Sequence, residues 1–444
     1  ARITFDLGRD KFVFSFNGTL EQKTLNRIFQ VPPLEGSLIQ GDVEVSAFLA
    51  SPLRFSARGR LAGREIRVPL KDEHAIVDFF LLEADPDGVN VRSANLRWRN
   101  SRLSLMGKLL AETKALRFDM DISADRVVWE EISEVIDSVG HRGNNERSPG
   151  IPLPPVEGIV RLNADNFSFA GFSSNPFQGT ASLSPQGIRG EIQRGDVCGI
   201  STAGTVDVTG EEISLNVSLS VTEGELGSTS LCLTENKLAV NGNYSLKAQV
   251  AGRGLLENIA QSLQGEFEFS AQDGQFAPSP TEDNPLEATF DYLNETGDFK
   301  VAFPDLDKES FPFRLISSRG KIEGTTLVND ELIMQSSLFT ITANGKIDVE
   351  HKQIDERGLV SVLLPGESVI KRIPIIGSII GSIIGGSIFG IPVRITGSLE
   401  HPDVTYLAPQ DVGAELLRIP VRILGLPLEA IRLFTPNVPE PERK

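Results

Sequence analysis

The chain has 444 residues, of which 40% are hydrophobic, and its formal net charge is -17. The length and apolar content predict a folded protein of two or three domains and exclude a disordered chain. Nucleic-acid binding needs a clustered basic surface, so the acidic balance predicts no nucleic-acid partner. The four histidines stand far apart and no CxxC motif occurs, so we expect neither a metal site nor a cofactor.

Apolar and polar residues alternate along most of the chain, which is typical of strands with one buried face. Near the start, this alternation places Phe12, Phe14 and Phe16 on one side of a strand. Similar stretches occupy residues 103–105, 167–172, 204–208, 213–221, 246–250, 267–271 and 338–349. Because long helices do not separate these stretches, the sequence predicts an antiparallel sheet rather than alternating strands and helices.

Shorter signals punctuate the predicted strands. The pairs Asp87-Gly88, Asn241-Gly242 and Asp273-Gly274 have the composition of hairpin turns. Residues 24–29, 129–139, 255–263 and 285–293 have the apolar spacing of short amphipathic helices.

Two segments predict the domain organisation. Residues 140–155 are polar and then rich in proline, and residues 278–285 are rich in proline, serine and acidic residues. Such compositions are typical of linkers. We therefore expect a β module with short helices over 1–139, a second β module over 156–277 and a C-terminal module over 286–434, followed by a frayed tail over 435–444.

The C-terminal third contains the most specific motifs. In order, they are Gly-Lys-Ile-Asp at 345–348, Leu-Leu-Pro at 363–365, Ile-Pro-Ile-Ile-Gly at 373–377, a Gly/Ile-rich segment, and Thr-Gly-Ser-Leu-Glu-His-Pro-Asp-Val at 396–404. This ordered set resembles the C-terminal region of the AsmA-like family of bacterial envelope proteins. Residues 156–274 are also similar to that family, especially 162–167 and 198–200.

The resemblance implies an architecture and a role. It implies an elongated antiparallel β-sheet curled into an apolar groove, which conducts phospholipid between the inner and outer membranes. It also implies a periplasmic location with an anchor in the inner membrane. Residues 1–5 already alternate like a strand and no signal peptide precedes them. We therefore expect the targeting and anchoring segment upstream, in a longer protein.

Seven phenylalanines are the candidates for a lipid-contacting groove: Phe12, Phe14, Phe16, Phe167, Phe169, Phe267 and Phe269. The alternative for each is an ordinary packed core. An apolar face must be covered by something, and either a second layer of protein or acyl chains can do this.

Residues 373–393 contain no charged residue, which predicts docking on protein or on a membrane. The candidate membrane-contacting residues are Ile375, Ile376, Ile379, Ile380, Ile383 and Ile384. Residues 412–434 combine leucine and isoleucine with interleaved arginines, as in an interfacial amphipathic helix. They predict a C-terminal helical cap, which either contacts the membrane or only protects the open edge of the sheet.

The cysteines Cys198 and Cys232 are the only two in the chain. Both lie in strand-like segments, and the oxidising periplasm implied by the resemblance favours a disulfide between them. Two buried free thiols remain the alternative.

No GxSxG, HExxH or phosphate-binding motif occurs, so we expect no enzymatic activity. The expected function is lipid handling, with phospholipid or another acyl-chain lipid and a membrane as partners. The alternative is a structural or assembly factor for outer-membrane protein biogenesis, with an outer-membrane protein as its partner.

Overall fold

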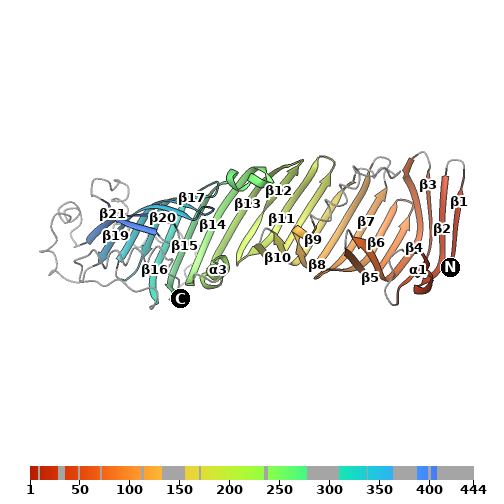
Figure 1. The fold of residues 1–444 in the computed structure, drawn as a ribbon, viewed down its shortest axis with the longest axis horizontal. Coiled ribbons are helices and arrows are strands. Elements are labelled where there is room, and N and C mark those ends of the chain that lie inside the picture. Colours follow the sequence, from red (N-terminus) through yellow and green to blue (C-terminus); the bar gives the residue numbers. More distant parts are fainter. Residues whose placement is uncertain are drawn as a thin grey trace, which may run out of the picture. The chain divides into compact units, whose positions relative to one another are not determined.

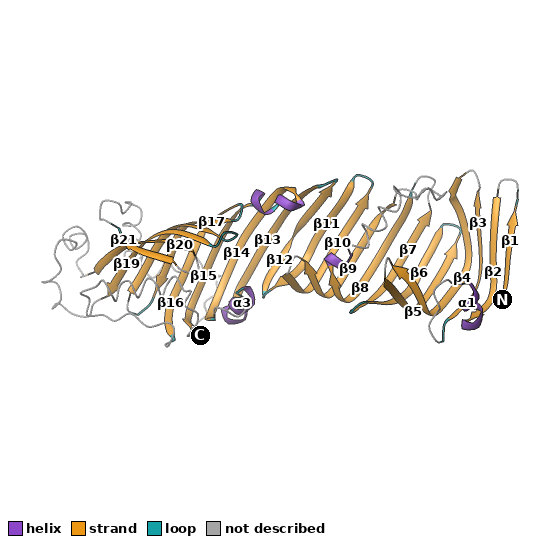
Figure 2. Ribbon diagram, viewed as in Figure 1, coloured by secondary structure: helices purple, strands orange, loops and turns teal. Residues whose placement is uncertain are grey.

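The structure is a computed structural model, and it divides the chain into two units. It describes residues 1–8, 11–28, 36–48, 51–70, 73–111, 115–132, 156–169, 172–234, 239–277, 310–337, 339–363, 388–398 and 402–407. Unit 1 comprises Ala1–Leu219 and Ala251–Ile259, and unit 2 comprises Ser220–Val250 and Ala260–Lys444. Both are mostly β, with few helices, as the sequence predicts (Figure 2).

Unit 1 is an open sheet whose strands follow one another in chain order (Figure 1). They are β1 (Arg2–Leu7), β2 (Lys11–Glu21), β3 (Leu38–Phe48), β4 (Ser51–Leu70), β5 (Glu73–Asp85), β6 (Gly88–Trp98), β7 (Ser101–Ala111), β8 (Leu116–Val128), β9 (Val156–Phe169), β10 (Phe172–Ser184), β11 (Gly187–Val197) and β12 (Ile200–Thr209). Each of these strands pairs with the next. Strands β13 (Glu212–Glu225) and β14 (Val240–Leu255) contribute residues to both units.

One pair departs from the predicted antiparallel arrangement: β8 and β9 run parallel, with Leu116 opposite Val156 and Ala124 opposite Ala164. A parallel pair needs a crossover connection of about a dozen residues or more, and residues 129–155 provide one. A helix begins in it at residues 129–132, within the predicted helix 129–139. The predicted antiparallel sheet is confirmed for the other strand pairs described above and fails at this pair, because strand alternation carries no information on strand direction.

The described part of unit 2 contains a second run of strands paired in chain order. They are β15 (Gln264–Phe276), β16 (Phe311–Glu323), β17 (Thr326–Gln335), β18 (Phe339–Asp348), β19 (Gln353–Leu363), β20 (Ile388–Ser398) and β21 (Pro402–Tyr406). All six pairs are antiparallel.

The packed core of unit 2 centres on stacked aromatic rings. Phe311 stacks on Phe339 with ring centroids 5.4 Å apart, and Phe276 contacts both Phe311 and Phe313. All four side chains are buried, and Phe339 is fully buried. Aromatic side chains contribute large buried areas, so this cluster anchors the start of β16 and β18.

The helices are short, and the sequence predicted them incompletely. Helix α1 (Gln22–Ile28) overlaps the predicted 24–29, and its Leu25 is fully buried. The predicted helix 255–263 was wrong: Leu255 ends β14, and the 3-10 turns η1 (Leu256–Asn258) and η2 (Ala260–Ser262) follow. Helix α3 (Leu226–Leu233) was not predicted, because serine and threonine interrupt its apolar pattern. The predicted helix 285–293 and both predicted linkers lie outside the described residues.

Two of the three predicted turns are instead irregularities inside strands. Asp87-Gly88 does end the β5–β6 hairpin, where Asp85 accepts hydrogen bonds from both backbone amides. Asn241-Gly242 lies within β14 and Asp273-Gly274 within β15, where Asp273 has a φ of 48°. Residues 167–172, predicted as one strand, span the end of β9 and the start of β10. Asn, Asp and Gly favour positive φ in both turns and bulges, so their composition alone does not separate the two.

Candidate functional site

One face of unit 1 is apolar from β1 to β12. Residues directly opposite each other on neighbouring strands point to the same face of a sheet. The strand register therefore aligns three rows of side chains, which we call the apolar face. The first row is Ile3, Phe16, Val43, Gly59, Ala84, Val89, Leu109, Phe118, Gly158, Leu183, Ile188 and Val208.

The two neighbouring rows run from β2 to β12. The second is Gly18, Gly41, Leu61, Leu82, Val91, Gly107, Met120, Val160, Ala181, Gly190 and Val206. The third is Leu20, Ile39, Gly63, Phe80, Ala94, Leu105, Ile122, Leu162, Gly179, Ile192 and Gly204. No polar side chain interrupts any of the three rows.

Two glycines in these rows lie beneath aromatic rings of an adjacent strand. A Cβ added to Gly63 would stand 2.3 Å from the ring of Phe80, and one added to Gly158 would stand 2.7 Å from the ring of Phe118. Only glycine leaves room for a ring to lie this close to the backbone of its neighbour. The rings therefore cover the glycine backbone and keep the surface apolar.

Most side chains of the apolar face are only half-buried. Phe16 and Val91 are buried, whereas Met120, Val160 and Leu183 keep intermediate exposure. At β1 the exposed fraction rises to 68% for Phe5 and 72% for Leu7. A local core forms where Ala124, Val127 and Ala164 pack together. The face is thus an extended apolar surface that the described residues cover incompletely.

The opposite face of the same strands is polar. One residue away from the first apolar row, the register aligns Arg2, Asn17, Asp42, Arg60, Glu83, Asn90, Lys108, Asp119, Ile159, Ser182, Arg189 and Asp207. Opposite charges meet along it: Arg60 pairs with Glu83 at 2.8 Å and Arg189 pairs with Asp207 at 2.6 Å. Apart from Ile159, every member is polar.

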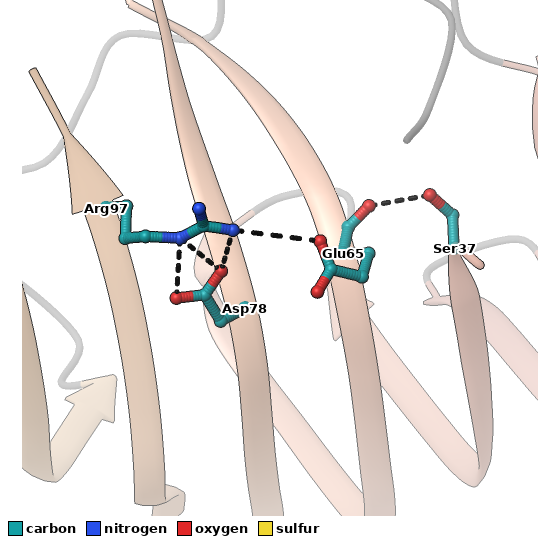
Figure 3. Close-up of polar contacts among 4 residues, drawn as sticks. All are labelled: Ser37, Glu65, Asp78 and Arg97. Carbon is teal, nitrogen blue, oxygen red and sulfur yellow. Dashed lines mark hydrogen bonds and ion pairs between the residues drawn. The ribbon is translucent and has the colours of Figure 1, made fainter. Parts of the chain in front are cut away.

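A polar network on β4, β5 and β6 shows how the strands are held in register (Figure 3). The Arg97 guanidinium donates to both carboxylate oxygens of Asp78, at 2.7 and 2.9 Å, and its second nitrogen lies 3.9 Å from Glu65. The Ser37 hydroxyl donates to the backbone carbonyl of Glu65 at 2.6 Å. The hydrogen bond to Asp78 raises the pKa of Arg97 above its ordinary value. Exposed pairs of this kind add little stability individually, but they fix which residues face each other.

Unit 2 has an apolar face built in the same way, but three polar side chains interrupt it. One row is Gly265, Ile322, Leu327, Ile347, Ile354, Gly397 and Pro402. The next is Phe267, Gly320, Asn329, Gly345, Glu356, Ile395 and Val404. The third is Phe269, Ser318, Leu332, Ala343, Gly358 and Val393.

These three polar residues, Ser318, Asn329 and Glu356, form a hydrogen-bonded chain that we call the polar triad. The Ser318 hydroxyl donates to the side-chain oxygen of Asn329 at 3.0 Å, and Asn329 Nδ2 donates to Glu356 Oε1 at 3.5 Å. The second donation crosses Gly345, which has no side chain between Asn329 and Glu356. Glu356 is only 4% exposed, and its Oε2 has no hydrogen-bond partner among the described side chains and backbone groups.

Burial raises the pKa of the Glu356 carboxyl to about 7. The hydrogen bond from Asn329 acts in the opposite direction, and the nearby charge of Asp355 adds to the increase. Desolvation penalises the charged form of a carboxyl, so this group is neutral in mildly acidic solution and ionises as the pH rises through 7. The sequence alone does not reveal the triad, because only the strand register brings its members together.

The seven candidate groove phenylalanines lie in different surroundings. Phe12, Phe14 and Phe16 follow one another on the apolar face of β2, and Phe5 contacts the first two rings. Phe267 and Phe269 belong to the apolar rows of unit 2. Phe167 stacks on Phe177 at 4.2 Å and packs against the local core of unit 1, whereas Phe169 is 45% exposed at the end of β9.

The six candidate membrane-contacting isoleucines lie outside the described residues, as does the predicted cap at 412–434. Among the helices that the structure describes, none is long and apolar enough to cross a membrane. Across the same described ranges, no group of three or more His, Cys, Asp or Glu side chains is placed to hold a metal ion.

Neither cysteine is a free thiol, because Cys198 and Cys232 are both disulfide-bonded. Cys198 has a φ of 55° between β11 and β12. Cys232 lies in α3, so its predicted strand environment was wrong. Scans against protein-family models, curated proteins and solved structures find no match for the chain.

Proposed function

We propose that this chain is a non-enzymatic lipid-handling protein of the bacterial envelope, which binds acyl chains along its apolar face. The observation that carries the proposal is the unbroken succession of apolar and glycine residues across β1 to β12. An ordinary two-layer fold covers such a face with a second sheet or with helices. Here the described residues of unit 1 leave most of it half-buried, and large exposed apolar surfaces mark binding sites.

The dimensions suit an extended lipid. Neighbouring strands lie about 4.8 Å apart, so a row across twelve strands spans roughly 50 Å. One leaflet of a bilayer core is roughly 15 Å thick, half of the whole hydrocarbon layer. The face is therefore longer than one acyl chain and offers successive positions from strand to strand across the sheet. Each methylene group removed from water contributes about 0.8 kcal/mol.

The two faces differ in what they offer to a lipid. The polar face, with its cross-strand ion pairs, stays hydrated and keeps the protein soluble outside a membrane. The apolar face presents no fixed charge in unit 1, so an acyl chain can shift along it without breaking a specific contact. This combination supports conduction, and together with the resemblance to AsmA-like proteins it supports phospholipid as the cargo, a periplasmic location and contact with both membranes.

The proposal predicts that protein purified without detergent retains lipid. Organic extracts are analysed by mass spectrometry for the wild type and two variants. The first variant, Met120→Gln with Val160→Gln, places two polar groups on the apolar face of adjacent strands. The control, Ile159→Gln, makes the same type of change on the polar face of β9. We expect the first variant to lose most of the bound lipid and the control to retain it.

Two results would contradict the proposal. Wild-type protein that carries no lipid and acquires none from vesicles would favour the alternative, an assembly factor whose apolar face receives an outer-membrane protein. Unfolding of the Met120→Gln, Val160→Gln variant, with Ile159→Gln unaffected, would identify a dry core, because buried amides without partners cost several kcal/mol.

A further inference from the structure

Glu356 in the polar triad is a buried carboxyl group without a cationic partner among the residues that the structure describes. Its Oε2 has no hydrogen-bond partner within the described ranges, although the residue is only 4% exposed. Within the three apolar rows of unit 2, the described residues on β15 to β20 include no basic side chain. The adjacent Arg357 and Arg394 face the other side, where Arg394 is bound to Asp355 at 3.0 Å. Buried charges are normally paired, so the described part of unit 2 provides only the acidic half of an ion pair here.

The triad is oriented to hold this acceptor in place. Because Ser318 donates to the oxygen of Asn329, the amide nitrogen of Asn329 is directed at Glu356 Oε1. One carboxylate oxygen thereby accepts a hydrogen bond, and the other is buried without a hydrogen-bond partner among the described residues. Asp348 and Glu331, which also lie on β18 and β17, are bound to His351 and Arg319 and do not share this face.

We propose that Glu356, positioned by Asn329 and Ser318, binds the primary ammonium group of an amphiphile whose apolar tail lies on the apolar face of unit 2. This inference rests on the proposed function for the tail and adds a specific site for the headgroup. An ammonium supplies both the missing positive charge and a donor for Oε2, and such charge-assisted hydrogen bonds are about twice as strong as neutral ones. An anionic headgroup would be repelled, and a hydroxyl would leave the charge uncompensated.

The experiment compares two probes with the same tail on the full chain. Dodecylamine, which is protonated at neutral pH, and dodecanol are titrated below their aggregation concentrations, and binding is followed by calorimetry at pH 6 and pH 8. We expect the amine to bind about tenfold more tightly than the alcohol at pH 8, as one charge-assisted hydrogen bond allows. The preference decreases at pH 6, because Glu356 then carries a proton.

Two variants test the assignment. Glu356→Gln removes the charge but keeps the shape, and it abolishes the preference for the amine. Asp355→Asn removes one charge from the neighbouring residue on the polar face, so it controls for attraction of a cation to an acidic protein. This control retains the preference for the amine, and the pH at which the preference decreases shifts slightly downward, because the Asp355 charge contributes to the raised pKa of Glu356.

The outcomes separate this inference from the proposed function. Equal affinity of the wild type for both probes would overturn the ammonium site and leave acyl-chain binding intact. Loss of the preference in Asp355→Asn as well as Glu356→Gln would also overturn it, because general electrostatics would then explain the binding. Failure of both probes to bind would instead overturn the proposed function. The pH dependence of the wild type needs no variant, so the test holds even where a substitution changes folding.

Discussion

The substitution Glu356→Gln should remove a pH dependence from the stability of unit 2. The folded-state pKa of Glu356 is about 7, against an ordinary value of 4.5. Because the folded pKa is the higher one, the carboxyl contributes its full stability below pH 4.5, where both states are protonated. That contribution is lost as the pH rises from 4.5 through 7, because the unfolded chain ionises more readily. At about 1.4 kcal/mol for each pKa unit, the loss is roughly 3 kcal/mol.

Urea denaturation at intervals between pH 4 and pH 8.5, followed by far-ultraviolet circular dichroism, measures this effect. The informative quantity is the difference in unfolding free energy between Glu356→Gln and the wild type, in which the other titrating groups cancel. We expect the two proteins to be similar near pH 4.5 and the variant to be more stable by roughly 3 kcal/mol at pH 8. A flat difference across this range would refute the burial of an uncompensated carboxyl.

Three further changes test other parts of the structure. Phe339→Ala should destabilise unit 2 by about 3–5 kcal/mol in the same urea assay, because it removes a fully buried ring stacked on Phe311. A loss below about 1 kcal/mol would contradict the aromatic core. Gly158→Ala should lower the free energy of unfolding by about 1–3 kcal/mol, because the added Cβ would stand 2.2 Å from the Phe118 carbonyl oxygen. Unchanged stability would show that β8 and β9 are not so closely paired. Mass spectrometry of unreduced, denatured protein should find no titratable thiol, with Cys198 and Cys232 joined to each other; two free thiols would disprove the disulfide.

The sequence predicted the mostly β architecture because the alternation of apolar and polar residues reports directly on strands with one apolar face. Phe12, Phe14 and Phe16 illustrate this, since their spacing alone places them on the same side of β2. Strand direction could not be predicted, because alternation looks the same in parallel and antiparallel pairs. The positive φ of Asp273 inside β15 was likewise indistinguishable from a turn, because turns and irregular strand positions use the same residues.

The candidate site was predicted in part. The phenylalanines indicated an apolar face from the sequence. Glycine, alanine and valine supply most of its rows, and these residues do not by themselves indicate a binding surface. The polar triad was missed because its members come from three strands, and only their register brings Ser318, Asn329 and Glu356 together. A glutamate in a strand that otherwise alternates regularly, between Ile354 and Gly358 on the same face, is the signal that could have identified it.

The parallel pairing of β8 and β9 allows the sheet of unit 1 to be viewed as two meanders joined end to end, β1 to β8 and β9 to β12. Within a meander, each strand runs opposite to the one before it, so successive turns lie at opposite ends of the strands. At the parallel junction, β9 runs in the same direction as β8. The apolar and polar faces nevertheless stay aligned, since Met120 lies beside Val160 and Asp121 beside Arg161. The hydrocarbon-like side therefore passes from one meander to the other without interruption, although the chain changes its strand-to-strand direction rule at this point.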